Sequence, residues 1–81
     1  MEMLPEVVFV QANEDYTLLL EFENGEKGIF DVKPYLEKGI FKELKNIEMF
    51  KTVKVSYGTV VWDNEADFCP DTIYLISEKI F

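Results

Sequence analysis

The stretch that decides the fold covers residues 16–32 and reads Tyr16-Thr17-Leu18-Leu19-Leu20-Glu21-Phe22-Glu23-Asn24-Gly25-Glu26-Lys27-Gly28-Ile29-Phe30-Asp31-Val32. Apolar side chains occupy every second position of its first half, the pattern of a strand with one face on a core. The pair Asn24-Gly25 is the strongest β-hairpin signal in the chain. The sequence therefore predicts antiparallel strands over residues 16–22 and 27–32, joined by a tight loop.

Charge placement decides the register of this hairpin. A two-residue loop would set charged side chains on the apolar face. A three-residue loop, Glu23-Asn24-Gly25 with its glycine in the left-handed conformation, pairs Leu18 with Phe30 instead. It also sets Glu21 opposite Lys27 on the outer face, which is a favourable cross-strand pair. We predict the three-residue loop, because a slip of one residue would turn the core face to solvent.

The segments on either side of the hairpin predict one further strand and several short helical turns. Val7–Ala12 reads as a strand, because it is short and rich in β-branched and aromatic residues. Pro34–Lys38 and Ile40–Lys45 predict short helical turns separated by a left-handed Gly39. A third turn is expected to place Met49-Phe50 against the core.

A second hairpin is predicted from the strands Thr52–Ser56 and Thr59–Trp62, with Tyr57-Gly58 between them. A two-residue loop needs Tyr57 at positive φ, which is unfavourable for a bulky residue. A longer loop that includes Ser56 avoids this conformation, so the loop length stays open.

The C-terminal segment predicts a short helix from about Asp71 to Glu78, with Pro70 at its first position. Ile73, Ile76 and Ile80 have the spacing of one apolar stripe. The whole pattern predicts one α+β domain over residues 1–81: an antiparallel sheet of two hairpin units, with short helical turns between them and a short C-terminal helix.

The net charge narrows the class of partner. Sixteen acidic residues stand against eight basic ones, for a net charge of −8, and every base is lysine. Nucleic-acid binding needs clustered Lys and Arg, so a direct nucleic-acid role is not expected. The negative charge can serve to keep the protein soluble, or it can attract a basic protein partner, and the sequence leaves both interpretations open.

The sequence lacks residues that common catalytic and metal-binding sites require. The chain has no histidine, the commonest general base at neutral pH and the commonest metal ligand. Its glycines are isolated, so no phosphate-binding loop is present. Cys69 can form neither an internal disulfide nor a cysteine-based zinc site, and it reads as a small buried filler. We therefore predict a non-enzymatic protein without a cofactor.

The N-terminal residues lack the basic and apolar regions of a secretory signal. No apolar run approaches the roughly 18 residues of a membrane span. The expected location is the cytoplasm.

The stretch Val60–Tyr74 is the best candidate for a working surface, because it carries several carboxylates together with the only Trp and the only Cys. We expect acidic side chains to meet a basic partner there, with tyrosines as aromatic anchors. The candidate partner-binding residues are Tyr57, Asp63, Glu65, Asp67, Asp71 and Tyr74. The alternative is a small-ligand or divalent-cation site on the acidic loop Asp63–Asp71, although the loop lacks the glycine and terminal bidentate glutamate of a calcium loop.

Two further expectations concern single elements. Trp62 should be mostly buried, near Val53 or Val55 and the C-terminal helix, because it alternates with Val60 on one strand face. The first strand has no Lys or Pro to guard its edge, so it is either paired internally or the edge of a homodimer.

Short motifs in a particular order resemble a bacterial family known only as a domain of unknown function, DUF2442. The first set is Asn24-Gly25-Glu26, Phe30-Asp31-Val32, Pro34-Tyr35-Leu36, Gly39-Ile40-Phe41, Leu44 and Phe50. The second set is Gly58-Thr59-Val60-Val61-Trp62, Ala66-Asp67, Pro70-Asp71 and Tyr74. The resemblance covers residues 7–76 and implies an α+β fold with antiparallel strands.

The resemblance also implies a genomic context. Genes of the family often lie beside a second small gene that is a candidate toxin, and some members carry an appended helix-turn-helix domain. These 81 residues contain no such appendage, so the resemblance does not imply DNA binding by this chain. It supplies no catalytic residues. An antitoxin-like, protein-binding role is the function that it favours.

Overall fold

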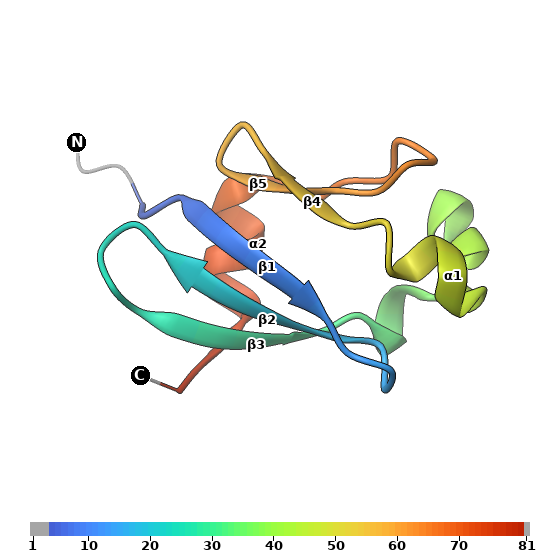
Figure 1. The fold of residues 1–81 in the computed structure, drawn as a ribbon, viewed down its shortest axis with the longest axis horizontal. Helices are drawn as coiled ribbons and strands as arrows, with labels where there is room; N and C mark the ends of the chain where they lie inside the picture. The colour runs from blue at the N-terminus through green and yellow to red at the C-terminus, as the bar shows by residue number, and fades with distance from the viewer. Residues whose placement is uncertain (1–3, 81) are drawn as a thin grey trace.

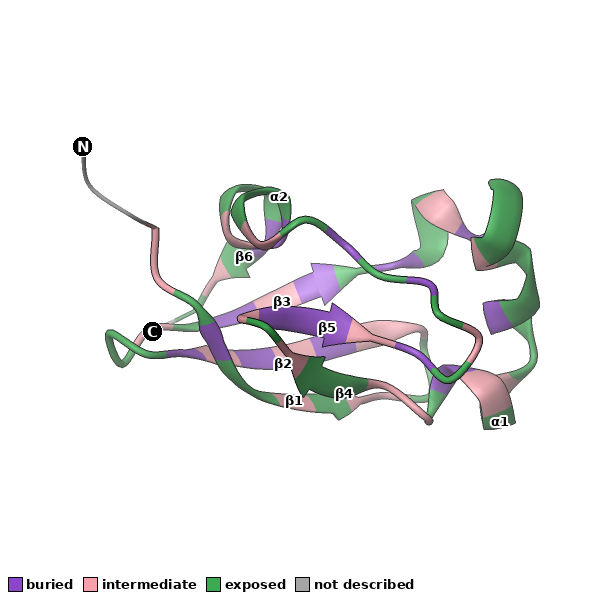
Figure 2. Cartoon of the chain, turned by 90° about the horizontal axis from the view of Figure 1, so that it is seen from above, coloured by how far each residue is buried: buried purple, intermediate pink, exposed green. Residues whose placement is uncertain are grey.

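A computed structural model describes residues 4–80 and confirms the α+β fold (Figure 1). In chain order the elements are β1 (Val7–Ala12), β2 (Thr17–Phe22), β3 (Lys27–Asp31), the 3-10 helices η1 (Lys33–Tyr35) and η2 (Gly39–Lys45), α1 (Ile47–Phe50), β4 (Lys54–Ser56), β5 (Thr59–Val61), α2 (Pro70–Ile76) and β6 (Glu78–Lys79). One antiparallel sheet has the strand order β1-β2-β3-β6, and β4 pairs with β5 in a second, smaller sheet. The helix α2 lies on one face of the larger sheet (Figures 1 and 2).

The predicted register of the first hairpin is confirmed. Leu18 lies opposite Phe30, and Glu21 lies opposite Lys27. Gly25 has φ +91°, the left-handed conformation that the three-residue loop requires. The apolar face of β2 is therefore turned inward, as the alternation of its sequence predicts.

The core is built on that inward face (Figure 2). Within β2, Leu18, Leu20 and Phe22 are buried while the residues between them are half-buried. Each fully buried side chain of this size stabilises the fold by about 1.5–3 kcal/mol. The remaining buried apolar residues are Val7, Phe30, Val32, Leu36, Leu44, Phe50, Val60, Trp62, Ala66, Phe68 and Ile73.

The helical turns between the two hairpins lie close to the predicted positions. Gly39 is left-handed, with φ +47°, and begins η2. The side chain of Asn46 accepts a hydrogen bond from the Glu48 N–H at 3.0 Å and so caps α1. Phe50 is fully buried and Met49 is half-buried against the core, as expected.

The second hairpin adopts the two-residue loop. Ser56 lies opposite Thr59, and Tyr57 and Gly58 have φ +50° and +78°. The strand β4 starts later than the sequence predicts, because Thr52 belongs to the turn after α1, where its hydroxyl donates to the Met49 carbonyl at 2.7 Å. The strand β5 ends at Val61, one residue earlier than predicted. The conformation that is unfavourable for Tyr57 is thus the one that occurs.

The prediction for the C-terminal stripe was only partly right. Ile73 is fully buried, but Ile76 and Ile80 are 46% and 52% exposed. The helix ends at Ile76, and the chain then extends along β3, where Gly28 pairs with Lys79. This extra strand takes Ile80 off the helix, so its spacing from Ile73 no longer places it on the same face.

The prediction that Trp62 is buried is confirmed, since its side chain is 1% exposed. Its ring neighbours are Phe41, Phe50 and Phe68, with centroids 5.9–6.4 Å away, and none of these lies in α2. The indole N–H donates to the Phe50 carbonyl at 2.9 Å. Val53 is half-buried against the core, and Val55 lies opposite Val60 but is more exposed.

The first strand is paired internally along one side, with β2, and is the outer strand of the larger sheet. On its other side β4 lies nearby (Figure 1). The Val7 N–H donates to the Gly58 carbonyl at 3.0 Å. The homodimer remains a prediction. Within residues 4–80, no helix has the length and apolar character needed to cross a membrane.

Candidate functional site

The candidate site lies on the outer face of the small β4–β5 sheet. Val60 and Trp62 point into the core, which leaves Thr59 and Val61 on the other face of the strand. After Trp62 the chain turns back, and the Trp62 N–H donates to the Ala66 carbonyl at 2.9 Å. Because successive side chains of β5 point to opposite sides, the strand has one face on the core and one outer face.

The returning segment repeats this alternation. Ala66 and Phe68 are buried, and Asp67 pairs with Val61 in an isolated antiparallel bridge. Glu65 makes the turn at φ +71°, and its N–H donates to the Trp62 carbonyl at 2.9 Å. The exposed carboxylates of Glu65 and Asp67 therefore belong to the outer face, beside Val61.

The outer face is hollowed into a groove of about 280 Å³, here named the hairpin groove. It is lined by Ser56, Tyr57, Thr59, Val61, Glu65 and Asp67. The Thr59 hydroxyl donates to the Phe68 carbonyl at 2.7 Å, which ties the two walls together. Val61 is half-buried and supplies an apolar surface inside the groove.

The hairpin groove brings together Tyr57, Glu65 and Asp67 of the predicted site. Asp63 is exposed on the turn, with its carboxylate 4.0 Å from the Lys54 ammonium group, and Asp71 is exposed in the first turn of α2. These two acids do not line the groove.

Tyr74 lies outside the groove and makes contacts within the fold. Its hydroxyl donates to the Glu26 carboxylate at 2.5 Å, and its ring packs edge-on against Phe22 with centroids 5.0 Å apart. The hydrogen bond raises the pKa of Tyr74 above its usual value and lowers the pKa of Glu26. The Lys79 ammonium group lies 4.1 Å from the Tyr74 ring centroid. Tyr74 therefore fastens α2 to the first hairpin and does not line the hairpin groove.

Tyr57 stands apart from the other tyrosines because its side chain is 96% exposed. Within the described chain, no hydrogen bond or ring contact engages its side chain. A left-handed conformation costs a non-glycine residue about 1–2 kcal/mol. The fold therefore holds the backbone of Tyr57 in an unfavourable conformation at the hairpin tip, where its phenol ring faces solvent.

Glu6 is a residue near the site that the sequence did not reveal. A Cβ atom added to Gly58 would lie 2.8–2.9 Å from the Glu6 side chain, so Glu6 packs on the hairpin tip. No local pattern connects residues so distant in the chain. Thr59 and Val61 were also missed, although their alternation with Val60 and Trp62 could have placed them on the outer face.

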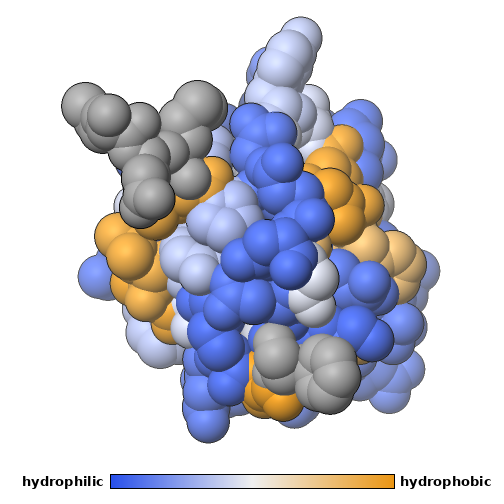
Figure 3. Space-filling model, turned by 90° about the vertical axis from the view of Figure 1, so that its left-hand side faces the viewer, coloured by the Kyte–Doolittle hydropathy of each residue, from blue (hydrophilic) through white to orange (hydrophobic). Residues whose placement is uncertain are grey.

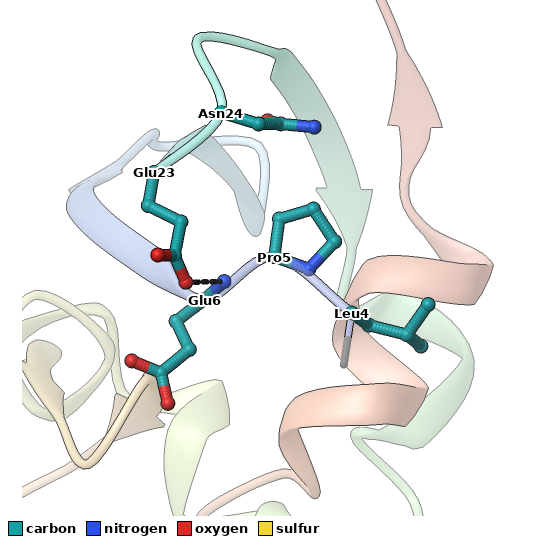
Figure 4. A pocket seen from close by; sticks show the side chains of 5 residues that line it. All are labelled: Leu4, Pro5, Glu6, Glu23 and Asn24. Atoms are coloured by element: carbon teal, nitrogen blue, oxygen red, sulfur yellow. Dashed lines mark hydrogen bonds between the residues drawn. The ribbon is translucent and has the colours of Figure 1, made fainter. Parts of the chain in front are cut away.

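A larger hollow, of about 460 Å³, lies between the segment before β1 and the β2–β3 loop (Figure 4). It is lined by Leu4, Pro5, Glu6, Glu23 and Asn24. The Glu23 carboxylate accepts the Glu6 N–H at 2.8 Å, and the Glu23 N–H donates to the Glu6 carbonyl at 2.8 Å. These polar groups hold the N-terminal segment to the hairpin, so we favour the hairpin groove as the site despite its smaller size.

A metal site finds little support in the geometry. Among residues 4–80, no three His, Cys, Asp or Glu side chains are grouped to hold a metal ion. Cys69 is exposed, contrary to prediction, because Phe68 and Ile73 take the inward positions on either side of the helix start. The acidic loop has the charge for a cation but not the convergence of ligands.

The surface around the chain ends is mainly hydrophilic, with hydrophobic side chains in separate patches (Figure 3). Exposed apolar residues occur on β1, at Val8 and Phe9, and on α2, at Leu75 and Ile76.

Comparison with known proteins gives one family. No curated protein and no solved structure matches the chain. The sequence model described as "Protein of unknown function (DUF2442)" matches residues 7–78 of the 81. The chain therefore belongs to the DUF2442 family.

Proposed function

We propose that this chain is a non-enzymatic protein-interaction module that binds a basic protein through the hairpin groove, as the antitoxin-like member of a two-gene pair. The supporting features are one exposed aromatic side chain, two carboxylates beside it and the acidic character of the whole chain.

Tyr57 is the observation that carries this proposal. Unfavourable backbone conformations persist where surrounding structure enforces them, and they gather at functional sites. Tyr57 has φ +50° and is 96% exposed. Tyrosine is among the residues that contribute most to binding at protein interfaces. Contact with a partner would give this side chain the burial that it lacks in the isolated chain.

Charge supports the choice of a basic partner. The net charge is −8, and the groove itself presents Glu65 and Asp67. Such a field speeds the encounter with a positively charged protein and discriminates against acidic ones. The same field repels a phosphate backbone, so the partner is a protein and not a nucleic acid.

Co-purification with the product of the adjacent gene tests the proposal. We expect the untagged neighbour to co-elute with the tagged chain at low salt. Tyr57→Ala should remove most of it, whereas Leu75→Ala, which truncates an exposed residue on α2, should not. A neighbour that never co-elutes, or that Tyr57→Ala retains in full, contradicts the proposal.

A further inference from the structure

We propose that the hairpin groove receives an arginine side chain from an extended basic segment of the partner. This inference rests on the proposed function and names the chemistry that the same surface recognises.

The shape of the groove suits a single long side chain. Its volume of about 280 Å³ lies at or below the lower end of small-molecule pockets, which span roughly 300–1,000 Å³. Val61 and Thr59 line its interior, and Tyr57 stands at the hairpin tip. A methylene stem can pack along this surface while its charged head remains near water.

The acidic wall suits the head group. Glu65 and Asp67 lie two positions apart and line the same groove. A guanidinium group has donors in a planar fork, which can serve two carboxylates at once, and it stacks on aromatic rings. An ammonium group is a compact, strongly hydrated point charge without that fork. We therefore expect arginine to bind better than lysine.

The composition of the chain points to another protein as the source of the arginine. The sequence contains no arginine, so a second copy of the chain cannot supply one. A second copy would also bring a further charge of −8 to an already acidic surface. The basic lysine nearest in sequence to the groove, Lys54, is directed toward Asp63, at 4.0 Å.

The test uses three blocked tripeptides, Ala-Arg-Ala, Ala-Lys-Ala and Ala-citrulline-Ala, titrated at millimolar concentration into the isotope-labelled full chain. Citrulline keeps the shape of arginine and removes its charge. We expect the arginine peptide to shift amide resonances of Tyr57, Thr59, Val61 and Asp67. We expect the citrulline peptide to bind about tenfold more weakly, because charged hydrogen bonds are lost.

Charge-neutralising variants locate the binding site. Glu65→Gln with Asp67→Asn should weaken arginine binding about tenfold, whereas Glu48→Gln, at an exposed acid on α1, should change it less than about twofold. The inference is overturned if no groove resonance shifts, if citrulline or lysine binds as well as arginine, or if the shifts map to the hollow at Glu6 and Glu23.

The same variants separate this inference from the proposed function. If the neighbouring gene product co-purifies with the Glu65→Gln, Asp67→Asn chain as well as with the wild type, the arginine site is wrong and partner binding stands. If the arginine peptide binds at the groove but no protein partner is retained, the proposed function fails and the site stands.

Discussion

At the residue scale, Tyr16, Tyr57 and Glu65 all have positive φ, but their surroundings differ. The Tyr16 ring packs against Phe50 with centroids 5.1 Å apart, and its hydroxyl donates to the Lys45 carbonyl. The N–H of Glu65 closes a turn with the Trp62 carbonyl. Within residues 4–80, the side chains of Glu65 and Tyr57 make no hydrogen bond or ring contact that would offset the conformation, and only Tyr57 exposes a large aromatic ring, which is why the binding proposal depends on it.

Trp62 carries the first stability prediction. Replacement by alanine should lower the free energy of unfolding by about 3–5 kcal/mol, because it empties a large aromatic site. Trp62→Phe should cost about 1–3 kcal/mol, since the buried Phe50 carbonyl loses its donor. Urea unfolding measures both. The exposed Val55→Ala should change stability by less than about 0.5 kcal/mol, and a similar small value for Trp62→Ala would refute the packing described here.

The Tyr74–Glu26 hydrogen bond predicts a pH dependence. The pKa of Tyr74 is raised in the fold, so its contribution is present below the ordinary tyrosine pKa and is lost as pH rises through the raised value. The pKa of Glu26 is lowered, so its contribution is present above the ordinary pKa of 4.5 and is lost as pH falls through the lowered value. Stability should therefore decline at both extremes.

Urea midpoints of the wild type and Tyr74→Phe across the pH range measure this contribution. The wild type should be the more stable at neutral pH, and the gap should close at both acidic and strongly alkaline pH. Glu26→Gln keeps an oxygen acceptor without the charge, so it should weaken the acidic limb. A gap between wild type and Tyr74→Phe that is constant with pH would show that the bond does not contribute as described.

At the element scale, the tip of the β4–β5 hairpin is joined to the segment before β1. Gly58 has φ +78°, its carbonyl accepts the Val7 N–H, and its Cα faces the Glu6 side chain. These contacts fix where the tip stands and so where Tyr57 projects.

A pair of glycine substitutions tests this junction. Gly39→Ala and Gly58→Ala should each lose about 1–2 kcal/mol of stability from the left-handed conformation. Gly39 has open space around it, whereas at Gly58 the new Cβ meets the outer atoms of the exposed Glu6 side chain, which must move aside, so Gly58→Ala should lose slightly more. Adding Glu6→Ala should recover this excess, as measured by chemical denaturation. An excess loss at Gly58→Ala that Glu6→Ala does not recover would mean that Glu6 does not pack on the tip.

The elements divide into those that local sequence predicts and those that it does not. The first hairpin is predictable because Asn24-Gly25 and the alternation of β2 agree on one register. The C-terminal strand β6 is not, because Glu78–Lys79 pairs with β3 through backbone groups that any residue supplies. The loop at Tyr57 runs against local preference, so propensity could only leave its length open.

Some residues of the candidate site could also be predicted from the sequence, and others could not. Glu65 and Asp67 were identified from their charge, and the structure places them in the groove with Tyr57. Tyr74 was chosen as an anchor from its residue type, but its contact with Glu26 depends on tertiary structure that the sequence pattern does not give. Glu6 reaches the site only through the same long-range packing.

At the scale of the whole molecule, repulsion between the many negative charges destabilises the compact folded state. The net charge is −8, and the ion pairs described are all on exposed side chains, where such pairs contribute little. Salt should therefore screen more repulsion than attraction. We expect the urea midpoint to rise as sodium chloride is raised from about 0.01 M to about 0.15 M, where the screening length falls from about 30 Å to about 8 Å. A midpoint that falls would show that the ion pairs dominate.

Under the binding proposal, Tyr57 is kept at the hairpin tip for binding and not for folding. The variant Tyr57→Asn tests it most directly, because Asn-Gly is the preferred sequence for a two-residue hairpin loop of this kind. Stability and affinity for the neighbouring gene product are measured on the same preparation. We expect the variant to be more stable by up to about 1 kcal/mol and to bind the partner at least about tenfold more weakly. A variant that binds as tightly as the wild type, or that is clearly less stable, would contradict it.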